Sequence, residues 1–150
     1  MEQLKPAPLG VKMSVLCLFI AIAAGIIEME IRIMELISNE SYSQIGVIIE
    51  ANVRTGIIAG IVYVIMKMYE GKNWARIMLL VVLGIIGKLT LIIDPIQWIL
   101  AGNALNNIFG DMTVYSSLLA INRIVHILAV CIGLFLMFRP AANRFFRAAA

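Results

Sequence analysis

Ionisable side chains lie inside long apolar stretches of this sequence, where a segment that faces lipid should carry only hydrocarbon. Glu50 and Arg54 have the i, i+4 spacing that pairs opposite charges on one helix. Glu28, Arg32 and Glu35 have the i, i+4, i+7 spacing that places side chains on one helical face. Ionisable groups inside a membrane pair with one another, bind ligands or carry protons. These residues are therefore candidates for binding or proton transfer.

The other two apolar stretches carry polar residues of the same kind. Lys88 shares a helical face with Gly84. The last stretch has Arg123 beside a stripe of polar and small residues made of Asn122, His126, Val130 and Gly133. All four stretches thus have a face that suits the interior of a helix bundle.

The charges lie at similar depths when each is counted from the basic residue at one end of its apolar stretch. At about 1.5 Å per residue, the separations are about 24 Å for Lys12 to Glu28, 20 Å for Lys67 to Arg54, 18 Å for Arg76 to Lys88 and 24 Å for Arg139 to Arg123. The acidic and basic residues in this layer nearly balance. We predict either an outward-facing polar pocket or an internal ion-pair network, closed on the cytoplasmic side by apolar residues.

Small residues indicate where helices come close together. Ala21 and Gly25 continue the face of Glu28, so this face should be interior, whereas Glu30 lies about 200° away and should point outward. Gly56 and Gly60 form a GxxxG packing motif.

The composition indicates an integral membrane protein. The chain has 150 residues, of which 62% are hydrophobic and 14% charged, and its mean hydropathy is +0.98. We expect one membrane domain over residues 1–150. The net charge of +3 is spread over the ends of apolar runs, which argues against nucleic acid as a partner. With one histidine and two separated cysteines, no metal or other cofactor is expected.

Four apolar stretches are long enough to cross a hydrocarbon core about 30 Å thick. The first resembles a signal peptide but is expected to remain as a transmembrane helix. Short connections favour an all-α, up-down antiparallel four-helix transmembrane bundle. The expected helices are about 12–37, 45–67, 75–94 and 113–138.

The distribution of Lys and Arg predicts the orientation. Eight basic residues at or beyond the ends of the spans fall on one side, whereas the first and third loops contain none. By the positive-inside rule, both termini are expected in the cytoplasm. The eight are Lys5, Lys12, Lys67, Lys72, Arg76, Arg139, Arg144 and Arg147.

The connecting loops carry turn and anchoring residues. Gly71 is expected to take a left-handed turn that ends the second helix, and Asn73 to cap the third. Trp74 and Arg76 should anchor this side at the headgroups, and Trp98 the other side. Trp98 belongs to the long third loop, which we expect to be an amphipathic helix or a lid above the pocket.

The segment Gly71-Lys72-Asn73-Trp74-Ala75-Arg76 and the closing "FRPAANRFFR" resemble elements of small, uncharacterised four-span bacterial inner-membrane proteins. The resemblance covers about 16 residues and consists largely of anchoring chemistry. It implies a multi-pass protein of the bacterial inner membrane.

We expect a non-enzymatic protein that binds a ligand or a membrane partner, such as another membrane protein or a toxin, as accessory or immunity proteins do. Four cations of the layer suit an anionic group: Arg32, Arg54, Lys88 and Arg123. The competing interpretation is a small proton-coupled transporter, in which Glu28 and His126 titrate and two copies form the pathway. His126 can also be a core histidine bonded to Asn122 or to a carboxylate. Ser116 and Ser117 are not aligned with His126 as nucleophile and base, which argues against a hydrolase.

Overall fold

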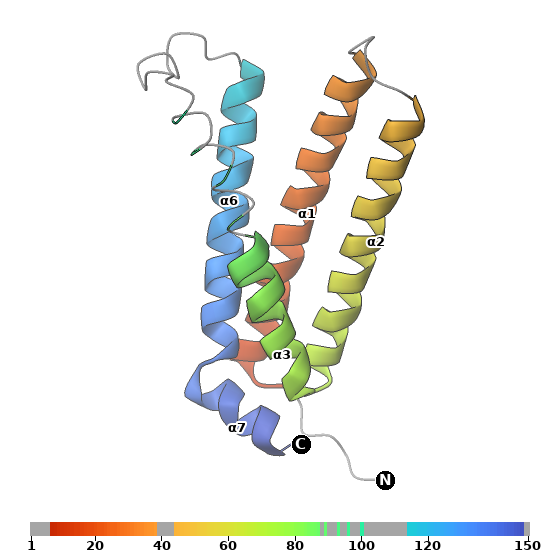
Figure 1. Ribbon diagram of the computed structural model, residues 1–150. Helices are drawn as coiled ribbons and strands as arrows, with labels where there is room; N and C mark the ends of the chain where they lie inside the picture. The colour runs from red at the N-terminus through yellow and green to blue at the C-terminus, as the bar shows by residue number, and fades with distance from the viewer. Residues whose placement is uncertain are drawn as a thin grey trace.

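The computed structural model describes residues 7–38, 44–87 and 114–148, together with 89, 93, 96 and 100. Every regular element in these residues is a helix, so the predicted all-α class is confirmed (Figure 1). The elements are α1 (Leu9–Ser38), α2 (Gln44–Tyr69), α3 (Asn73–Leu79), the π-helix η1 (Leu80–Ile86), α6 (Val114–Met137) and α7 (Pro140–Ala148).

Three of these helices contain segments long and apolar enough to cross a membrane: Leu9–Ile31, Gln44–Tyr69 and Ser117–Met137. They correspond to the first, second and fourth predicted spans. The third predicted span, 75–94, is described continuously as far as Gly87. Its apolar helix, Asn73–Ile86, is shorter than the three helices of membrane-spanning length. The structure thus shows a helical protein with three apolar helices of membrane-spanning length.

Helix α1 lies at the centre of the assembly. It packs along α6 over most of its length and also against α2, which runs antiparallel to it (Figure 1). Helix α3 packs on α2, and η1 continues from α3 to contact α6. Helix α7 turns across the end of the bundle where α1 begins and α6 ends. We call this end the α7 end.

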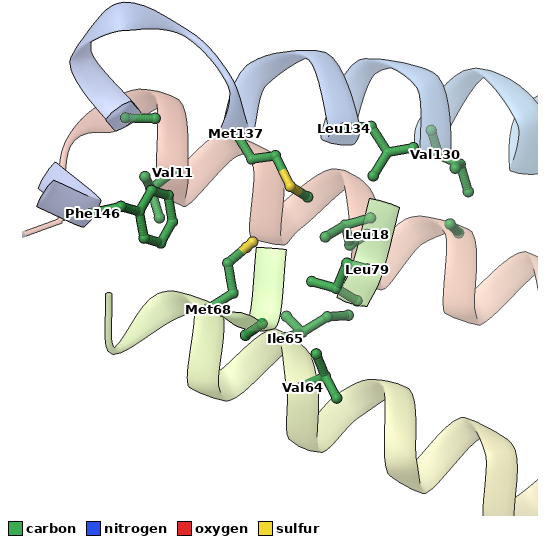
Figure 2. Packing of buried hydrophobic residues seen from close by; sticks show 14 residues of the cluster. Val11, Leu18, Val64, Ile65, Met68, Leu79, Val130, Leu134, Met137 and Phe146 are labelled. Atoms are coloured by element: carbon green, nitrogen blue, oxygen red, sulfur yellow. The ribbon is translucent and has the colours of Figure 1, made fainter. Parts of the chain in front are cut away.

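The buried apolar core lies at the α7 end. Figure 2 shows side chains from α1, α2, α3, α6 and α7 converging there. Leu18 and Ile65 are fully buried, and Phe146 is 1% exposed. Five helices therefore share one core, which closes this end of the bundle with tightly packed hydrocarbon.

The turn between α2 and α3 forms as predicted at its glycine. Gly71 has φ 88°, the left-handed conformation that ends many helices. Its N–H donates to the Met68 carbonyl (2.9 Å), and the Lys72 N–H donates to the Lys67 carbonyl (3.1 Å). The predicted cap at Asn73 is wrong: the N-cap residue is Lys72, whose side chain makes no capping hydrogen bond.

Helix η1 brings the third apolar helix close to α6 at Gly84. A Cβ atom at Gly84 would lie 3.0 Å from Cδ1 of Leu134 and 3.3 Å from Cδ1 of Leu80. The Gly87 N–H donates to the Val82 carbonyl, five residues back, as in a π-helix. Such segments occur often at functional sites, and this one borders the pocket described below.

Arg76 holds α7 against the bundle. Its guanidinium carbon lies 5.0 Å from the ring centroids of both Phe138 and Phe146, and Nη1 donates to the Asn143 side chain. Phe146 and Ala142 form the buried side of α7. We expected this arginine at the headgroups; the structure shows that it also links α3 to α7.

Arg76→Ala should loosen α7, because it removes two cation–π contacts and one hydrogen bond. At about 1 kcal/mol for such a contact, amide hydrogen exchange in α7 should accelerate about fivefold. The matched control is Lys67→Ala, which removes a cation that pairs with Glu70 on the surface. Equal exchange rates in both variants would show that Arg76 does not hold α7.

Candidate functional site

The interface between α1 and α6 contains a buried hydrogen bond. Ser14 is fully buried, and its Oγ donates to the Gly133 carbonyl at 2.7 Å. The helices are close here, since a Cβ atom at Gly133 would lie 3.2 Å from Cγ of Leu18. Close approach at a small residue, with a hydroxyl donating across the interface, is typical of helix pairs in membranes.

Two further polar contacts lie beyond the core along the same interface. Asn122 Nδ2 donates to the Ala24 carbonyl at 2.9 Å. One turn after Ala24 on α1, Glu28 Oε1 accepts hydrogen bonds from the Arg123 guanidinium, with Nη2 at 2.7 Å and Nε at 2.8 Å. The predicted interior faces of the first and fourth spans therefore meet at Glu28 and Arg123.

A pocket of about 530 Å³ lies between α1, α2, η1 and α6. Glu28, Arg54, Arg123 and His126 line it, so three helices contribute polar groups to one cavity. The remaining lining is mostly apolar and comes from Leu18, Ala21, Ile22, Gly25, Met29, Ile57, Ile58, Ile61, Leu83 and Gly87. The pocket thus combines a charged part with a hydrocarbon wall.

Arg54 reaches the pocket from α2 while bound to a neighbour on its own helix. Its Nε and Nη2 donate to Glu50 Oε1 at 3.1 and 2.8 Å. The predicted i, i+4 pair is therefore present. Glu50 is not part of the lining, so the described lining holds two guanidinium groups and one carboxylate.

His126 lies on α6 opposite Gly25. A Cβ atom at Gly25 would lie 3.8 Å from Cε1 and 3.9 Å from Nδ1 of this ring. Nδ1 is buried and has no hydrogen-bond partner among the described residues. The expected bond to Asn122 does not form there, because Asn122 donates to the Ala24 carbonyl. A buried ring nitrogen without a partner is a group that a ligand can satisfy.

Some predicted site residues fall outside what the structure describes. Lys88 and Trp98 are not described, nor are the side chains of Arg32 and Glu35, whose backbone belongs to α1. Trp74 is described and is 46% exposed at the α7 end.

Glu28 and Glu30 lie on opposite faces of α1, as predicted. Glu28 is half-buried in the pocket, whereas Glu30 is exposed. The GxxxG motif, in contrast, does not pack within the described chain: a Cβ atom at Gly56 or Gly60 would meet no atom within 4 Å. The close contacts occur instead at Gly84 and Gly133.

Ser14 is a polar residue of the interface between α1 and α6 that was not predicted. Its signal is present, since residues 14, 18, 21 and 25 continue the i, i+4, i+7, i+11 face that leads to Glu28. Among the described residues, no group of three or more His, Cys, Asp or Glu side chains is placed to hold a metal ion. No protein family, curated protein or solved structure matches this chain.

Proposed function

We propose that this is a non-enzymatic membrane protein that binds a ligand or a membrane partner through the pocket between α1, α2, η1 and α6. The observation that carries the proposal is the meeting of Arg54, Arg123, Glu28 and His126 in one cavity of about 530 Å³. Its volume is in the range of small-molecule sites. Ionisable groups within a membrane that face a shared cavity support the hypothesis of a functional site.

The charges of the lining favour an anionic group on the ligand. A guanidinium has five N–H donors, and the carboxylate contacts of Arg54 and Arg123 use Nε and Nη2 of each. Donors therefore remain on both arginines, and the buried Nδ1 of His126 adds a third polar contact. Arginine pairs of this kind suit a carboxylate or phosphate.

The apolar wall favours a ligand with a hydrocarbon part. Ile22, Ile57 and Leu83 line the pocket from three different elements, α1, α2 and η1. An amphiphile fits this division, with its anionic group at the arginines and its chain on the wall. A transmembrane segment with an acidic residue has the same chemistry, which is the form that an accessory or immunity protein would bind.

The membrane setting of the proposal rests on the sequence. Continuation of the third apolar helix over 75–94 would complete a four-helix bundle with both termini on one side, and the basic residues place that side in the cytoplasm. The pocket then opens toward the outside. The resemblance in the second loop and the carboxyl-terminal segment supports a bacterial inner membrane.

Capture of the partner or lipid from native membranes tests the proposal. Arg54→Ala should abolish co-purification of a specific protein or lipid, identified by mass spectrometry, because it removes one of the two guanidinium groups in the pocket. The matched control, Lys67→Ala, removes a cation of the same helix that pairs with Glu70 outside the pocket, and capture should persist. Circular dichroism and gel filtration in detergent establish that both variants fold. Unchanged capture by folded Arg54→Ala protein would refute binding at this pocket.

A proton-coupled transporter is the second candidate, because Glu28 and His126 line the same pocket. It predicts ligand-driven proton movement in proteoliposomes that is lost in Glu28→Gln. Absence of such movement across a substrate panel, together with capture that depends on Arg54, would leave the binding function.

A further inference from the structure

The α7 end of the bundle is strongly basic. Among the described residues at this end, seven are cationic and one, Glu70, is acidic. Lys67 already binds that carboxylate, with Nζ 2.8 Å from Oε2. The cations are Lys12, Lys67, Lys72, Arg76, Arg139, Arg144 and Arg147.

Five of these cations are exposed without an ion-pair partner in the described chain: Lys12, Lys72, Arg139, Arg144 and Arg147. Arg147 lies near enough to the Arg76 guanidinium for their like charges to interact. We call these five residues the basic surface. Like charges gathered without carboxylates attract an anionic partner.

Helix α7 presents part of this surface in a fixed direction. Phe146 and Ala142 are buried on one side; at about 100° per residue Arg144 falls on the opposite side and Arg147 about 120° from the centre of the buried side. The stacking of Arg76 between Phe138 and Phe146 holds the helix in this orientation. The two arginines are therefore kept on the outer side of α7.

The position of α7 identifies the partner as lipid. It crosses the end of apolar helices whose length suits a membrane, so it lies where the bilayer meets water (Figure 1). A cluster of basic residues directly beside the cytoplasmic ends of membrane helices is typical of a site that binds anionic lipid headgroups. Arginine is also suited to bind phosphate oxygens bidentately.

We infer that the basic surface binds the headgroups of anionic phospholipids in the leaflet next to α7. This binding is independent of the pocket, which lies between the helices beyond the core. It would fix the depth and tilt of the bundle in the membrane through a layer of lipid phosphates.

Quenching of Trp74 fluorescence by brominated lipids measures the lipids at this end. The chain has two tryptophans, so Trp98→Phe leaves Trp74, which is 46% exposed at the α7 end, as the reporter. The full chain is reconstituted into vesicles that contain brominated phosphatidylglycerol or brominated phosphatidylcholine. The ratio of quenching constants gives the preference for the anionic lipid.

Each cation near an anionic surface contributes about a fivefold factor, so Arg144 and Arg147 together can contribute about 25-fold to the preference for phosphatidylglycerol. Arg144→Gln with Arg147→Gln should therefore reduce the preference of the Trp98→Phe protein by at least about fivefold, while Arg144→Lys with Arg147→Lys should retain most of it because charge is conserved.

Salt titration of the unmodified basic surface tests the inference without any change in α7. The preference should fall steeply between low salt and 1 M NaCl, where the screening length is about 3 Å. Absence of a preference, a preference that salt does not reduce, or loss in the lysine pair equal to that in the glutamine pair would each overturn the inference.

Discussion

Gly133→Val should destabilise the protein by about 3 kcal/mol, near the upper end of the cost of overpacking a core. A Cβ atom at this position would lie 3.2 Å from Cγ and Cδ2 of Leu18 and 3.4 Å from Cβ of Cys17. Leu18 is fully buried and cannot swing into open space. The added side chain must therefore push α1 away from α6, which also stretches the hydrogen bond from Ser14 to the Gly133 carbonyl.

The matched control is Gly56→Val. No atom lies within 4 Å of a Cβ atom at Gly56, so the valine meets no other part of the described chain. Since glycine is about 1 kcal/mol less favourable than alanine in a helix, this variant should be neutral or slightly stabilised. Thermal unfolding of both variants in one detergent, followed by circular dichroism, measures the difference. Equal losses of stability would mean that valine in a helix, and not the contact of α1 with α6, is responsible.

The long helices were predictable from the sequence because their apolar runs exceed the thickness of a membrane. The expected spans 12–37, 45–67 and 113–138 agree within three residues with α1, α2 and α6. The remaining differences arise at helix ends, where local hydrogen bonding decides the boundary and hydropathy does not. Gly71 was predictable because its left-handed backbone conformation strongly favours glycine.

Two elements were not predicted. Helix α7 follows Arg139 and starts at Pro140, a residue that suits the first helical position. The sequence indicated only membrane anchoring for this segment, because its burial depends on contacts of Phe146 with other helices. The π-helix η1 has no clear signal in single-residue propensities, and it lies where Gly84 comes close to Leu134 of α6.

The sequence predicted which helix faces form the site, but it did not predict which side chains bind one another there. Helical spacing correctly placed Glu28 and Arg123 toward a common interior, where they meet at 2.7 Å. The partner of Asn122 was not predictable, because the choice between His126 and the Ala24 carbonyl depends on the rotation of α6 against α1. Small residues likewise indicate close approach without saying which helix comes near, as Gly60 shows.

The Glu28–Arg123 pair should couple α1 to α6 energetically, as a double-mutant cycle will show. Arg123→Gln alone should cost about 2 kcal/mol, less than the loss of a fully buried pair, because the Arg123 and Glu28 side chains are 40% and 23% exposed. Adding Glu28→Gln should restore part of the stability, since no unpaired carboxylate remains. We expect a coupling energy of about 1.5 kcal/mol for reversible unfolding in mixed micelles.

The Glu50–Arg54 pair provides the comparison, because it has similar side-chain exposure (32% and 43%) and a similar distance of 2.8 Å. Both residues lie on α2, and helices of membrane proteins persist when their packing is lost. The pair therefore survives in the unfolded state, and its coupling energy in the same assay should be near zero. Equal coupling in the two cycles would indicate one structural network. A larger coupling energy for Glu28–Arg123 than for Glu50–Arg54 would show that Arg123 joins two helices on folding. It would also show that the ion pair of Arg54 contributes little to stability, as expected of a side chain that binds a ligand.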